Sequence, residues 1–559
     1  VWNDPEGILG SKTVTTKTFY DDQGNVVRSI DADGNESTTF YNAQGKIIAS
    51  TDKYGKTTQT SYDIKGNKVE TIFPDGTVSR SVYDANDRDI VSQDRHIPGE
   101  IATGTRNIYN AVGQIIRVER LNNLVIGLTD DGNGCKASSF VSADVVYSTS
   151  ETFDAAGRLI ARIDAKGNKT SYEFDAAGRN IAVTDALGNR SEYSYDAKGN
   201  RIAFKDALNR VTRYTYDANS NLIATEFPDG TRSTTTYNKL GQKVSQTDQS
   251  GLTTQFAYND AGMLIKVIKP QVTDENGSAV TPTWTYAYDE YMRMTSVTDP
   301  KGRVNKTSYD AFGRKISEQK PGGEKVSYSY NSFGQIQREI DAKGQVAEYV
   351  YDSFGRLERK NYYTSSQAAS PEESVQIIYD AQGRQHKVVE PRGTTEYTYD
   401  LENRITKLQT PEGTINYEYD PQNGQKTRVW TANSNIKYAY DELNRLKTVT
   451  DNRNGVTEYT YNKVGARTAV KLPNKVTTEY VYNDLNRLTQ VVNKDVAGTV
   501  LSSYSYTLAP NGRRTGVDEM HKGNADTNIE RSVRYTYDAM NRLITEVSSS
   551  TQPTLNYSG

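Results

Sequence analysis

A motif that returns about every 21 residues restricts the fold of this chain more than any other feature of its sequence. The motif is an aromatic residue followed by Asp or Asn, and successive copies within four series lie 20 or 21 residues apart. Repeats of this length stack unit on unit, so one extended repeat domain is expected rather than several globular ones. The aromatic positions of the four series are Tyr20, Tyr41, Tyr62 and Tyr83; Phe153, Phe174, Tyr195, Tyr216, Tyr237 and Tyr258; Tyr288, Tyr309, Tyr330 and Tyr351; and Tyr379, Tyr399, Tyr419, Tyr440, Tyr461 and Tyr482.

Residues 189–209 show how one unit is built. Two runs that alternate in polarity are separated by turns that begin at Asp196 and Asp206. An Asp at the first turn position can accept hydrogen bonds from backbone N–H groups of its own turn, and Gly or Asn three residues later tolerates the left-handed conformation. A period of two between such turns predicts strands. Each unit is therefore expected to be a β-hairpin, and the chain an antiparallel meander.

The composition favours a sheet without a thick apolar interior. The residues AVILMFWYC make up 35% of the chain and the mean hydropathy is -0.75, both low for a globular protein. Disorder is excluded by 40 Tyr, 12 Phe and 3 Trp, because disordered chains contain few aromatics. Stacked repeats align pairs such as Tyr193 and Tyr195 with their counterparts, and each cross-strand pair contributes roughly 0.2–1 kcal/mol. Such ladders of side chains are predicted to hold the sheet together.

The predicted fold is all-β: tandem hairpins form one continuous spiralling antiparallel sheet, a hollow shell or cocoon or an open part of one. Open twisted sheets rarely exceed ~10 strands without curling, so a sheet of this length must curl. The chain is interpreted as one continuous repeat domain over residues 1–559, a fragment of a longer protein. Irregular insertions are expected near residues 92–106, 120–148, 270–283, 361–375 and 511–533.

Charge and residue usage exclude several classes of protein. The net charge is -3, so no basic excess indicates binding to nucleic acid or to an anionic membrane. The single cysteine, Cys135, excludes an intrachain disulfide framework and a cysteine-rich metal site. No apolar run approaches the ~18 residues of a transmembrane helix. The chain starts at Val1 and shows no secretory signal.

The sequence offers no catalytic residue, no cofactor-binding residue and no metal site, so the chain is not expected to be an enzyme. Its three histidines, His96, His386 and His521, lie far apart, and none is next to a plausible nucleophile. No Gly-Lys-Ser/Thr loop that could cradle a phosphate is present.

Two weaker signals have ordinary explanations. The segment 31–34, Asp-Ala-Asp-Gly, resembles the opening of a calcium loop, but its Gly is fourth rather than sixth and its twelfth position is Asn42. Turn chemistry accounts for it. Trp284, beside the 270–283 insertion, is a possible contact for a ligand or partner, although packing on a strand face is the more ordinary role.

The pattern Tyr-Asp-Ala-x-Gly resembles the YD repeat of the Rhs family. Clear copies start at Tyr195 and Tyr309, and a copy with Asn541 in the glycine position starts at Tyr537; the resemblance covers nearly the whole chain. The family includes Rhs polymorphic toxins, the C components of insecticidal Tc toxins, wall-associated proteins and teneurins, and it implies a large spiral β-shell. The residues chosen to represent the structural motif are Tyr62, Asp63, Gly66, Tyr195, Asp196, Gly199, Tyr309, Asp310, Gly313, Tyr351, Asp352 and Gly355.

The resemblance implies a non-enzymatic shell that encapsulates and carries a C-terminal toxin domain, for competition between bacteria or toxicity to a host. Autoproteolysis and toxin activity would then reside C-terminal to residue 559. The expected partners are the protein's own toxin segment and secretion-apparatus or other toxin subunits, and the expected location is secreted or at the bacterial surface. The alternative is a cell-surface adhesion module that binds glycans through rows of exposed tyrosines.

Overall fold

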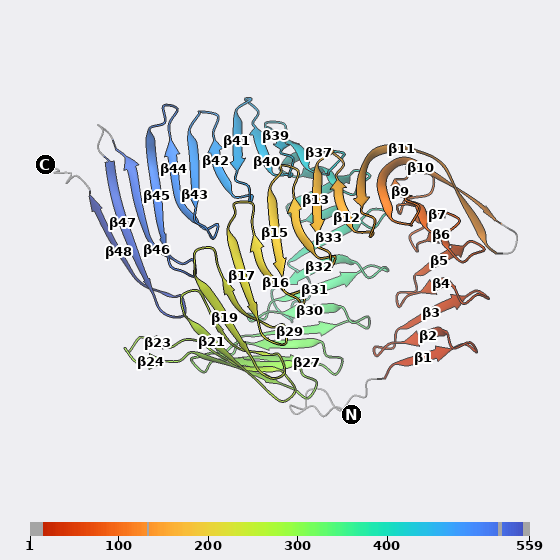
Figure 1. The fold of residues 1–559 in the computed structure, drawn as a ribbon. Helices are drawn as coiled ribbons and strands as arrows, with labels where there is room; N and C mark the ends of the chain where they lie inside the picture. Colours follow the sequence, from red (N-terminus) through yellow and green to blue (C-terminus); the bar gives the residue numbers. More distant parts are fainter. Residues whose placement is uncertain (1–14, 131–133, 524–527, 552–559) are drawn as a thin grey trace.

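A computed structural model of the chain describes residues 15–130, 134–523 and 528–551, and in these residues every regular element is a strand (Figure 1). Forty-six strands form one antiparallel sheet, and β23 and β24 form a separate hairpin. Each strand of the large sheet pairs with the next one along the chain, with β22 pairing to β25 across the small hairpin. The predicted all-β fold, one continuous meander of hairpins, is thus confirmed.

The strands fall into two consecutive groups, which we call the first winding (β1–β22) and the second winding (β25–β48). The first winding and the small hairpin contain β1 (Lys17–Tyr20), β2 (Val26–Ile30), β3 (Glu36–Tyr41), β4 (Ile47–Thr51), β5 (Thr57–Tyr62), β6 (Lys68–Ile72), β7 (Val78–Tyr83), β8 (Asp89–Gln93), β9 (Gly104–Tyr109), β10 (Ile115–Asp130), β11 (Lys136–Phe153), β12 (Leu159–Ile163), β13 (Lys169–Phe174), β14 (Asn180–Thr184), β15 (Arg190–Tyr195), β16 (Arg201–Lys205), β17 (Val211–Tyr216), β18 (Leu222–Glu226), β19 (Arg232–Tyr237), β20 (Lys243–Thr247), β21 (Thr253–Tyr258), β22 (Leu264–Ile268), β23 (Val272–Thr273) and β24 (Ala279–Val280). The second winding contains β25 (Thr283–Tyr288), β26 (Met294–Thr298), β27 (Val304–Tyr309), β28 (Lys315–Gln319), β29 (Lys325–Tyr330), β30 (Ile336–Ile340), β31 (Val346–Tyr351), β32 (Leu357–Tyr363), β33 (Glu373–Tyr379), β34 (Gln385–Glu390), β35 (Gly393–Tyr399), β36 (Ile405–Thr410), β37 (Gly413–Tyr419), β38 (Lys426–Trp430), β39 (Asn435–Tyr440), β40 (Leu446–Thr450), β41 (Val456–Tyr461), β42 (Arg467–Lys471), β43 (Thr477–Tyr482), β44 (Leu488–Lys494), β45 (Val500–Leu508), β46 (Arg514–Lys522), β47 (Asn528–Tyr537) and β48 (Leu543–Thr551).

The turn after Tyr351 shows how the motif shapes the backbone. Asp352 Oδ1 accepts hydrogen bonds from the backbone N–H groups of Phe354 and Arg356, each at 2.9 Å. The Gly355 N–H donates to the Asp352 carbonyl at 2.9 Å, and Gly355 has φ of 73°, in the left-handed region. Burial raises the pKa of the Asp352 carboxyl, but the hydrogen bonds from Arg356 and Phe354 outweigh burial and hold that pKa below its usual value. We call the turns that follow the aromatic column tyrosine turns, and the turns between them intervening turns.

The left-handed position of these turns follows the sequence expectation. It is occupied by glycine in most repeats, while Asn209 and Ser220 take it with φ of 65° and 63°. Glycine and asparagine reach this conformation with less strain than other residues. The predicted role of the fourth turn position is therefore confirmed.

Side chains of the tyrosine turns tie each repeat to its neighbours. The Tyr351 hydroxyl donates to the Ile336 carbonyl at 2.8 Å, one strand back along the chain. Arg356 Nε donates to Asp352 Oδ2 at 2.8 Å, and the same guanidinium lies 4.3 Å from the ring centroid of Tyr379 in the next repeat. Cation–π contacts of this kind contribute roughly 0.5–2 kcal/mol each. The motif is thus a ladder of bonds that runs along one edge of the sheet.

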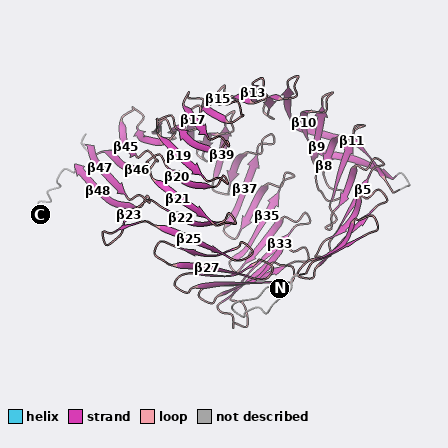
Figure 2. Cartoon of the chain, turned by 60° about the horizontal axis from the view of Figure 1, so that its bottom comes forward, coloured by secondary structure: helices cyan, strands magenta, loops and turns pink. Residues whose placement is uncertain are grey.

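The sheet curls into an open shell rather than closing on itself (Figures 1 and 2). Its solvent-accessible surface is 32381 Å², whereas a compact protein of this mass exposes about 20,000 Å². Most strand residues are half-buried or exposed. The fold therefore depends on cross-strand ladders and turn contacts, as the composition predicts.

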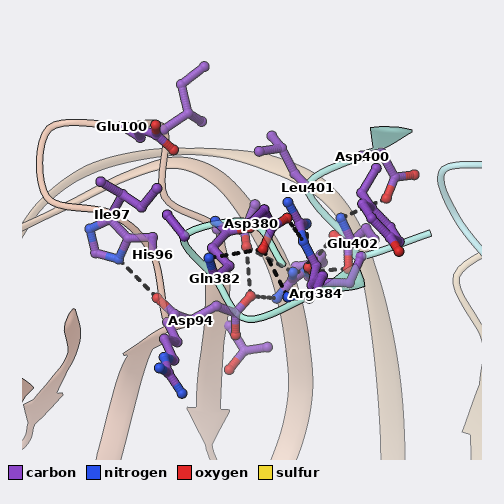
Figure 3. Close-up of a pocket in the computed structure, with 18 of the residues that line it drawn as sticks. Asp94, His96, Ile97, Glu100, Asp380, Gln382, Arg384, Asp400, Leu401 and Glu402 are labelled. Atoms are coloured by element: carbon purple, nitrogen blue, oxygen red, sulfur yellow. Dashed lines mark hydrogen bonds and ion pairs between the residues drawn. The ribbon is translucent and has the colours of Figure 1, made fainter. Parts of the chain in front are cut away.

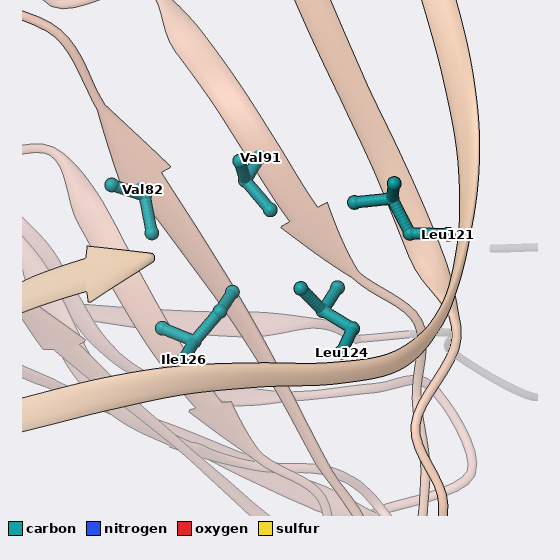
Figure 4. Packing of buried hydrophobic residues seen from close by; sticks show 5 residues of the cluster. All are labelled: Val82, Val91, Leu121, Leu124 and Ile126. Carbon is teal, nitrogen blue, oxygen red and sulfur yellow. The ribbon is translucent and has the colours of Figure 1, made fainter. Parts of the chain in front are cut away.

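One local exception is a hydrophobic core under the long hairpin β10–β11. This hairpin crosses β5, β6 and β7 and buries a cluster of five side chains (Figure 4). The cluster consists of Val82, Val91, Leu121, Leu124 and Ile126. Lys136 Nζ also reaches from β11 to Glu70 in β6, at 2.5 Å. Burial raises the pKa of Glu70, but the bonds from Lys136 and Arg80 outweigh it and lower that pKa.

The stretches expected to be irregular have different structures. Residues 120–148, predicted as an insertion that interrupts the repeat, lie mainly in β10 and β11, the longest strands. This hairpin stays in the meander between β9 and β12 and also packs over β5–β7. Residues 511–533 lie mainly in β46 and β47, and residues 524–527 are outside the described part. Residues 92–106 contain a loop held by a bridge between His96 and Val78, residues 270–283 contain β23–β24, and residues 361–375 contain a loop after β32.

Candidate functional site

The two windings meet along a line of side-chain contacts that we call the seam. Its hydrogen bonds join residues 238 to 297 positions apart in sequence. Contacts near the start of the first winding involve residues near the start of the second, and later contacts involve later residues of both. The seam residues are Asp33, Asn35, Lys53, Tyr54, Lys56, Arg120, Lys166, Arg210, Asp248, Gln249 and Ser250 in the first winding, and Arg314, Ser332, Phe333, Ser353, Phe354, Glu402, Asp420, Asn483, Arg487 and Asn511 in the second.

The seam joins opposite edges of the sheet. Nearly all its residues in the first winding belong to intervening turns or connections, such as Asp52–Lys56, and those in the second belong to tyrosine turns, such as Asp352–Arg356. The hydrogen bonds across the seam all involve side chains. A contact of this kind can open and close without unpairing the strands of either winding.

At the start of the seam, Tyr54 fills the space above a tyrosine turn of the second winding. Its ring lies 4.8 Å from the ring of Phe333, and Lys53 Nζ donates to the Phe333 carbonyl at 2.6 Å. A Cβ added at Gly355 would lie 2.5 Å from the Tyr54 ring. Lys56 Nζ lies 4.0 Å from the ring centroid of Phe354. Aromatic and cationic side chains thus interlock at this point.

In the middle of the seam, Arg120 from β10 forms a two-pronged ion pair with Glu402. Its Nε and Nη2 donate to the two carboxylate oxygens at 2.8 and 3.0 Å. Arg120 Nη1 also pairs with Asp94 at 2.6 Å. Burial lowers the pKa of the Arg120 guanidinium, but the bonds to Glu402 and Asp94 outweigh burial and raise it. Bidentate charged pairs of this type are among the stronger hydrogen bonds in proteins.

Further along, the contacts remain polar. Lys166 Nζ pairs with Asp420 at 2.6 Å. Burial raises the pKa of Asp420, but the bonds from Lys166 and from the backbone of its own turn outweigh it and lower that pKa. Arg487 Nη2 donates to Gln249 Oε1 at 2.6 Å, and Asn511 Nδ2 donates to a carboxylate oxygen of Asp248 at 3.1 Å.

A pattern in the sequence distinguishes the tyrosine turns of the two windings. The third position of tyrosine turns in the second winding often carries a bulky apolar residue that is half-buried: Phe312, Phe333, Phe354, Leu443, Val464 and Leu485. In the first winding the same position is mostly polar or small and exposed: Gln23, Gln44, Lys65, Ala156, Ala177 and Lys198. Leu240, an apolar residue at this position in the first winding, is 80% exposed. At Phe333 and Phe354 the partners that cover the ring are seam residues of the first winding, Tyr54 and Lys56.

The predicted motif residues occupy equivalent places in four repeats, but only two of those repeats reach the seam. The hydroxyls of Tyr62, Tyr195, Tyr309 and Tyr351 each donate to a carbonyl 15 residues earlier in the chain, at 2.8 to 3.0 Å. Asp63, Asp196, Asp310 and Asp352 each accept hydrogen bonds from the backbone of their own turns. Gly66, Gly199, Gly313 and Gly355 all have positive φ, between 73° and 89°. The turns at Asp310 and Asp352 lie at the seam, and those at Asp63 and Asp196 lie on the free edge of the first winding.

Trp284, singled out as a possible contact for a ligand, lies in β25 opposite Val267 and is half-buried. His386 lies in β34, and His521 lies in β46 with its ring 5.5 Å from that of Tyr504. Cys135 is half-buried just before β11.

The calcium-like segment at 31–34 is a seam turn. Asp31 binds the backbone of its own turn, and Asp33 pairs with Arg314 at 3.2 Å. In residues 15–130, 134–523 and 528–551, no three His, Cys, Asp or Glu side chains gather in a way that could hold a metal ion. Within the same residues, no helix has the length and apolar character needed to cross a membrane.

We expect Gly355→Ala to weaken the seam, because the new Cβ would collide with Tyr54. Gly178→Ala is a matched control, since Gly178 has φ of 81° and open space around it. Both changes impose left-handed strain of about 1–2 kcal/mol, and the seam variant adds about 1–3 kcal/mol for the collision. Hydrogen exchange should become faster at residues 52–56 in the Gly355 variant alone. Equal exchange in the two variants would contradict the proposed role of this contact.

Known protein families and structures resemble this chain. The family described as Teneurin YD-shell matches residues 281–436 and 424–559, and the family described as RHS Repeat matches residues 20–57, 153–190, 195–232 and 237–271. Comparison with curated proteins gives no match.

One solved structure shares the fold, and a second is reported beside it. A crystal structure titled TcdB2-TccC3-Cdc42 matches with a TM-score of 0.63 and 15% identity, over 96% of this chain and 31% of that chain. A structure of the Photorhabdus luminescens Tc holotoxin pore matches with a TM-score of 0.49 and 14% identity, over 95% of this chain and 34% of that chain. This chain thus spans about a third of the length of either structure's matched chain.

Proposed function

Because this chain belongs to the RHS/YD-repeat family, we propose that it is a non-enzymatic shell segment that encloses a polypeptide cargo, a C-terminal toxin domain. The observation that carries the proposal is the seam. A thin sheet of 46 strands becomes a curved wall when its second winding docks on its first through contacts that each use at least one side chain. Such a wall can exclude proteases and hold a chain away from the producing cell without any catalytic residue.

The exposed surface and composition support sequestration. The strand residues are mostly half-buried or exposed and rich in Ser, Thr and Tyr, so the wall offers a polar surface to an enclosed chain. A polar lining favours loose containment over tight binding, because few apolar contacts hold the cargo in one conformation. The solved structure with the same fold has a chain about three times as long, which is consistent with further segments beside the shell.

Glycan binding by rows of tyrosines receives less support. The strand-ending tyrosines use their hydroxyls to bind backbone carbonyls, and arginines of the preceding repeats lie over several of their rings. Arg384 is 4.6 Å from the ring centroid of Tyr399, and Arg404 is 4.8 Å from that of Tyr419. A guanidinium already occupies one face of each of these rings, which leaves less room for a sugar to stack.

The test is limited proteolysis of the full-length gene product that contains this domain, followed by mass spectrometry and cryo-EM of what survives. We expect a segment outside the repeats to remain protected and to co-purify with the shell. The Gly355→Ala variant should make that segment more sensitive to protease, while Gly178→Ala should not. If no protected segment exists, or if its protection is the same in all three proteins, the enclosure proposal fails.

A further inference from the structure

A cavity of about 820 Å³ lies at the middle of the seam, between the loop 94–103 and the tyrosine turns 380–384 and 400–404 (Figure 3). The two sides of the cavity come from different windings, so any molecule held there would touch both. Its volume is within the ~300–1,000 Å³ typical of ligand sites. Five carboxylates and three guanidinium groups line it, which leaves an excess of negative charge.

The hydrogen-bond donors of the arginines around this cavity are largely in use. Arg120 donates to Glu402, Asp94, Thr103 and the Gly104 carbonyl, which occupies its five N–H groups.

The two other arginines are also engaged. Arg384 donates to Asp380 at 2.7 Å and to Asn403 at 2.7 Å. Arg95 points to Thr77 and Asp75 instead. The cavity therefore has little capacity left to bind an anion.

Several acceptors around the cavity have no partner among the described residues. The Glu100 carboxylate makes no ion pair and accepts no hydrogen bond there, and the buried Gln382 Oε1 has no donor. His96 is only 8% exposed, and its Nδ1 donates to the Asp94 carbonyl at 3.0 Å. In the neutral ring Nε2 is then an acceptor, and it too has no partner in the described part of the chain. The cavity therefore presents hydrogen-bond acceptors that a ligand carrying N–H donors could satisfy.

The rim of the cavity carries exposed apolar side chains, which favour a ligand with an apolar part. Ile101 is 56% exposed and Leu401 is 48% exposed, and they approach from opposite windings. A ligand that satisfies both features has an aliphatic stem and a cationic head that only donates hydrogen bonds. Lysine and arginine side chains have this form.

We propose that this seam cavity binds a lysine or arginine side chain of an extended polypeptide segment, with the cation at Glu100 and His96 and the stem between Ile101 and Leu401. The volume exceeds one side chain, so the neighbouring residues of the segment are held as well. A bound segment would bridge the two windings and stabilise the seam, since a ligand stabilises the state that binds it. The proposal does not depend on enclosure of a cargo.

The test uses the 559-residue chain and the capped tripeptides acetyl-Ala-Lys-Ala-amide and acetyl-Ala-norleucine-Ala-amide. Calorimetry should show the lysine peptide binding at least about tenfold more tightly than the norleucine peptide, because only lysine carries the charge. Glu100→Gln should weaken lysine binding about five- to tenfold. The matched control is Glu442→Gln, which changes another exposed glutamate without an ion pair and should leave binding unchanged.

Hydrogen exchange locates the bound peptide. The lysine peptide should slow exchange at residues 94–103 and 400–404 and leave the turn at 441–445 unchanged. Equal binding of the two peptides, or equal effects of the two glutamate variants, would overturn the proposal. Spermidine binding as tightly as the lysine peptide would overturn the assignment to a polypeptide and indicate a free polyamine instead.

Discussion

Leu121→Ala should destabilise the region around β10–β11 by about 2–5 kcal/mol. Leu121 is 1% exposed and belongs to the cluster that also contains Val82, Val91, Leu124 and Ile126. Removing its side chain leaves a cavity between two layers of sheet that cannot close without moving the hairpin. Native-state hydrogen exchange should report the loss in β7, β8, β10 and β11.

A leucine from the single-layered part of the sheet provides the control. Leu446 lies half-buried in β40, where side chains can relax toward solvent, so Leu446→Ala should cost less than about 2 kcal/mol. In a repeat array each unit contacts mainly its neighbours, so the Leu121 effect should stay local and leave β25–β48 unchanged. Equal losses for the two variants would show that the hairpin core is no stronger than the ladders.

The repeat unit could be predicted from sequence because its information is local. The Asp at the start of the turn and the residue at the left-handed position act within five residues, so patterns such as Asp217 to Asn221 specify both the turn and its strand ends. Ser220, which replaces glycine at the left-handed position of this turn, adopts the same conformation with φ of 63°.

The seam could not be predicted in this way. Near-identical repeats do not specify which turn of the first winding contacts which turn of the second. This pairing depends on the twist that the sheet accumulates over more than 20 strands. Arg120 and Glu402 are 282 residues apart, and no spacing in the sequence relates them. The apolar residues Phe312, Phe333 and Phe354 were a usable signal, because a bulky ring at an otherwise exposed turn tip needs a partner.

The hairpin β10–β11 departs from the repeat because its turn carries only a decayed copy of the motif, Thr129-Asp130-Asp131-Gly132, with no aromatic residue before the Asp. Its strands are 16 and 18 residues long, about three times the length of strands in a repeat. Leu121, Leu124 and Ile126 are buried there, but their spacing is broken by a register shift between Asn122 and Val125. An interrupted alternation resembles an irregular insertion when only sequence is considered.

Lowering the pH from about 4 to about 2 should unfold the sheet. In many tyrosine turns the aspartate pKa lies below its usual value, as at Asp352, Asp441 and Asp538. At each of these, burial raises the pKa, but hydrogen bonds from the backbone and from the arginine four residues later outweigh burial. Because the folded-state pKa is lower than the unfolded one, each carboxylate stabilises the fold above about pH 4. That stability is lost as the pH falls through the folded-state value.

The measurement is circular dichroism of strand content against pH, with stability expected to be flat between about pH 5 and 8. Asparagine variants separate charge from hydrogen bonding, because Asn331 already accepts the same backbone bonds at 2.9 and 3.0 Å in its own turn. The double variant Asp352→Asn with Asp441→Asn should therefore lower stability at neutral pH and flatten its dependence on acid. A pH profile identical to that of the parent chain would mean that these carboxylates are not the groups that titrate.

The order of events in acid follows from where the charges lie. The ion pair of Lys166 with Asp420 joins the two windings, and Asp420 also accepts a hydrogen bond from the backbone of its own turn. Protonating Asp420 removes the ion pair across the seam, whereas the strands on either side keep their backbone hydrogen bonds. Exchange at seam turns should therefore increase at a higher pH than strand content is lost. If both change together, the windings and the strands form one cooperative unit, and the seam cannot open as an independent joint.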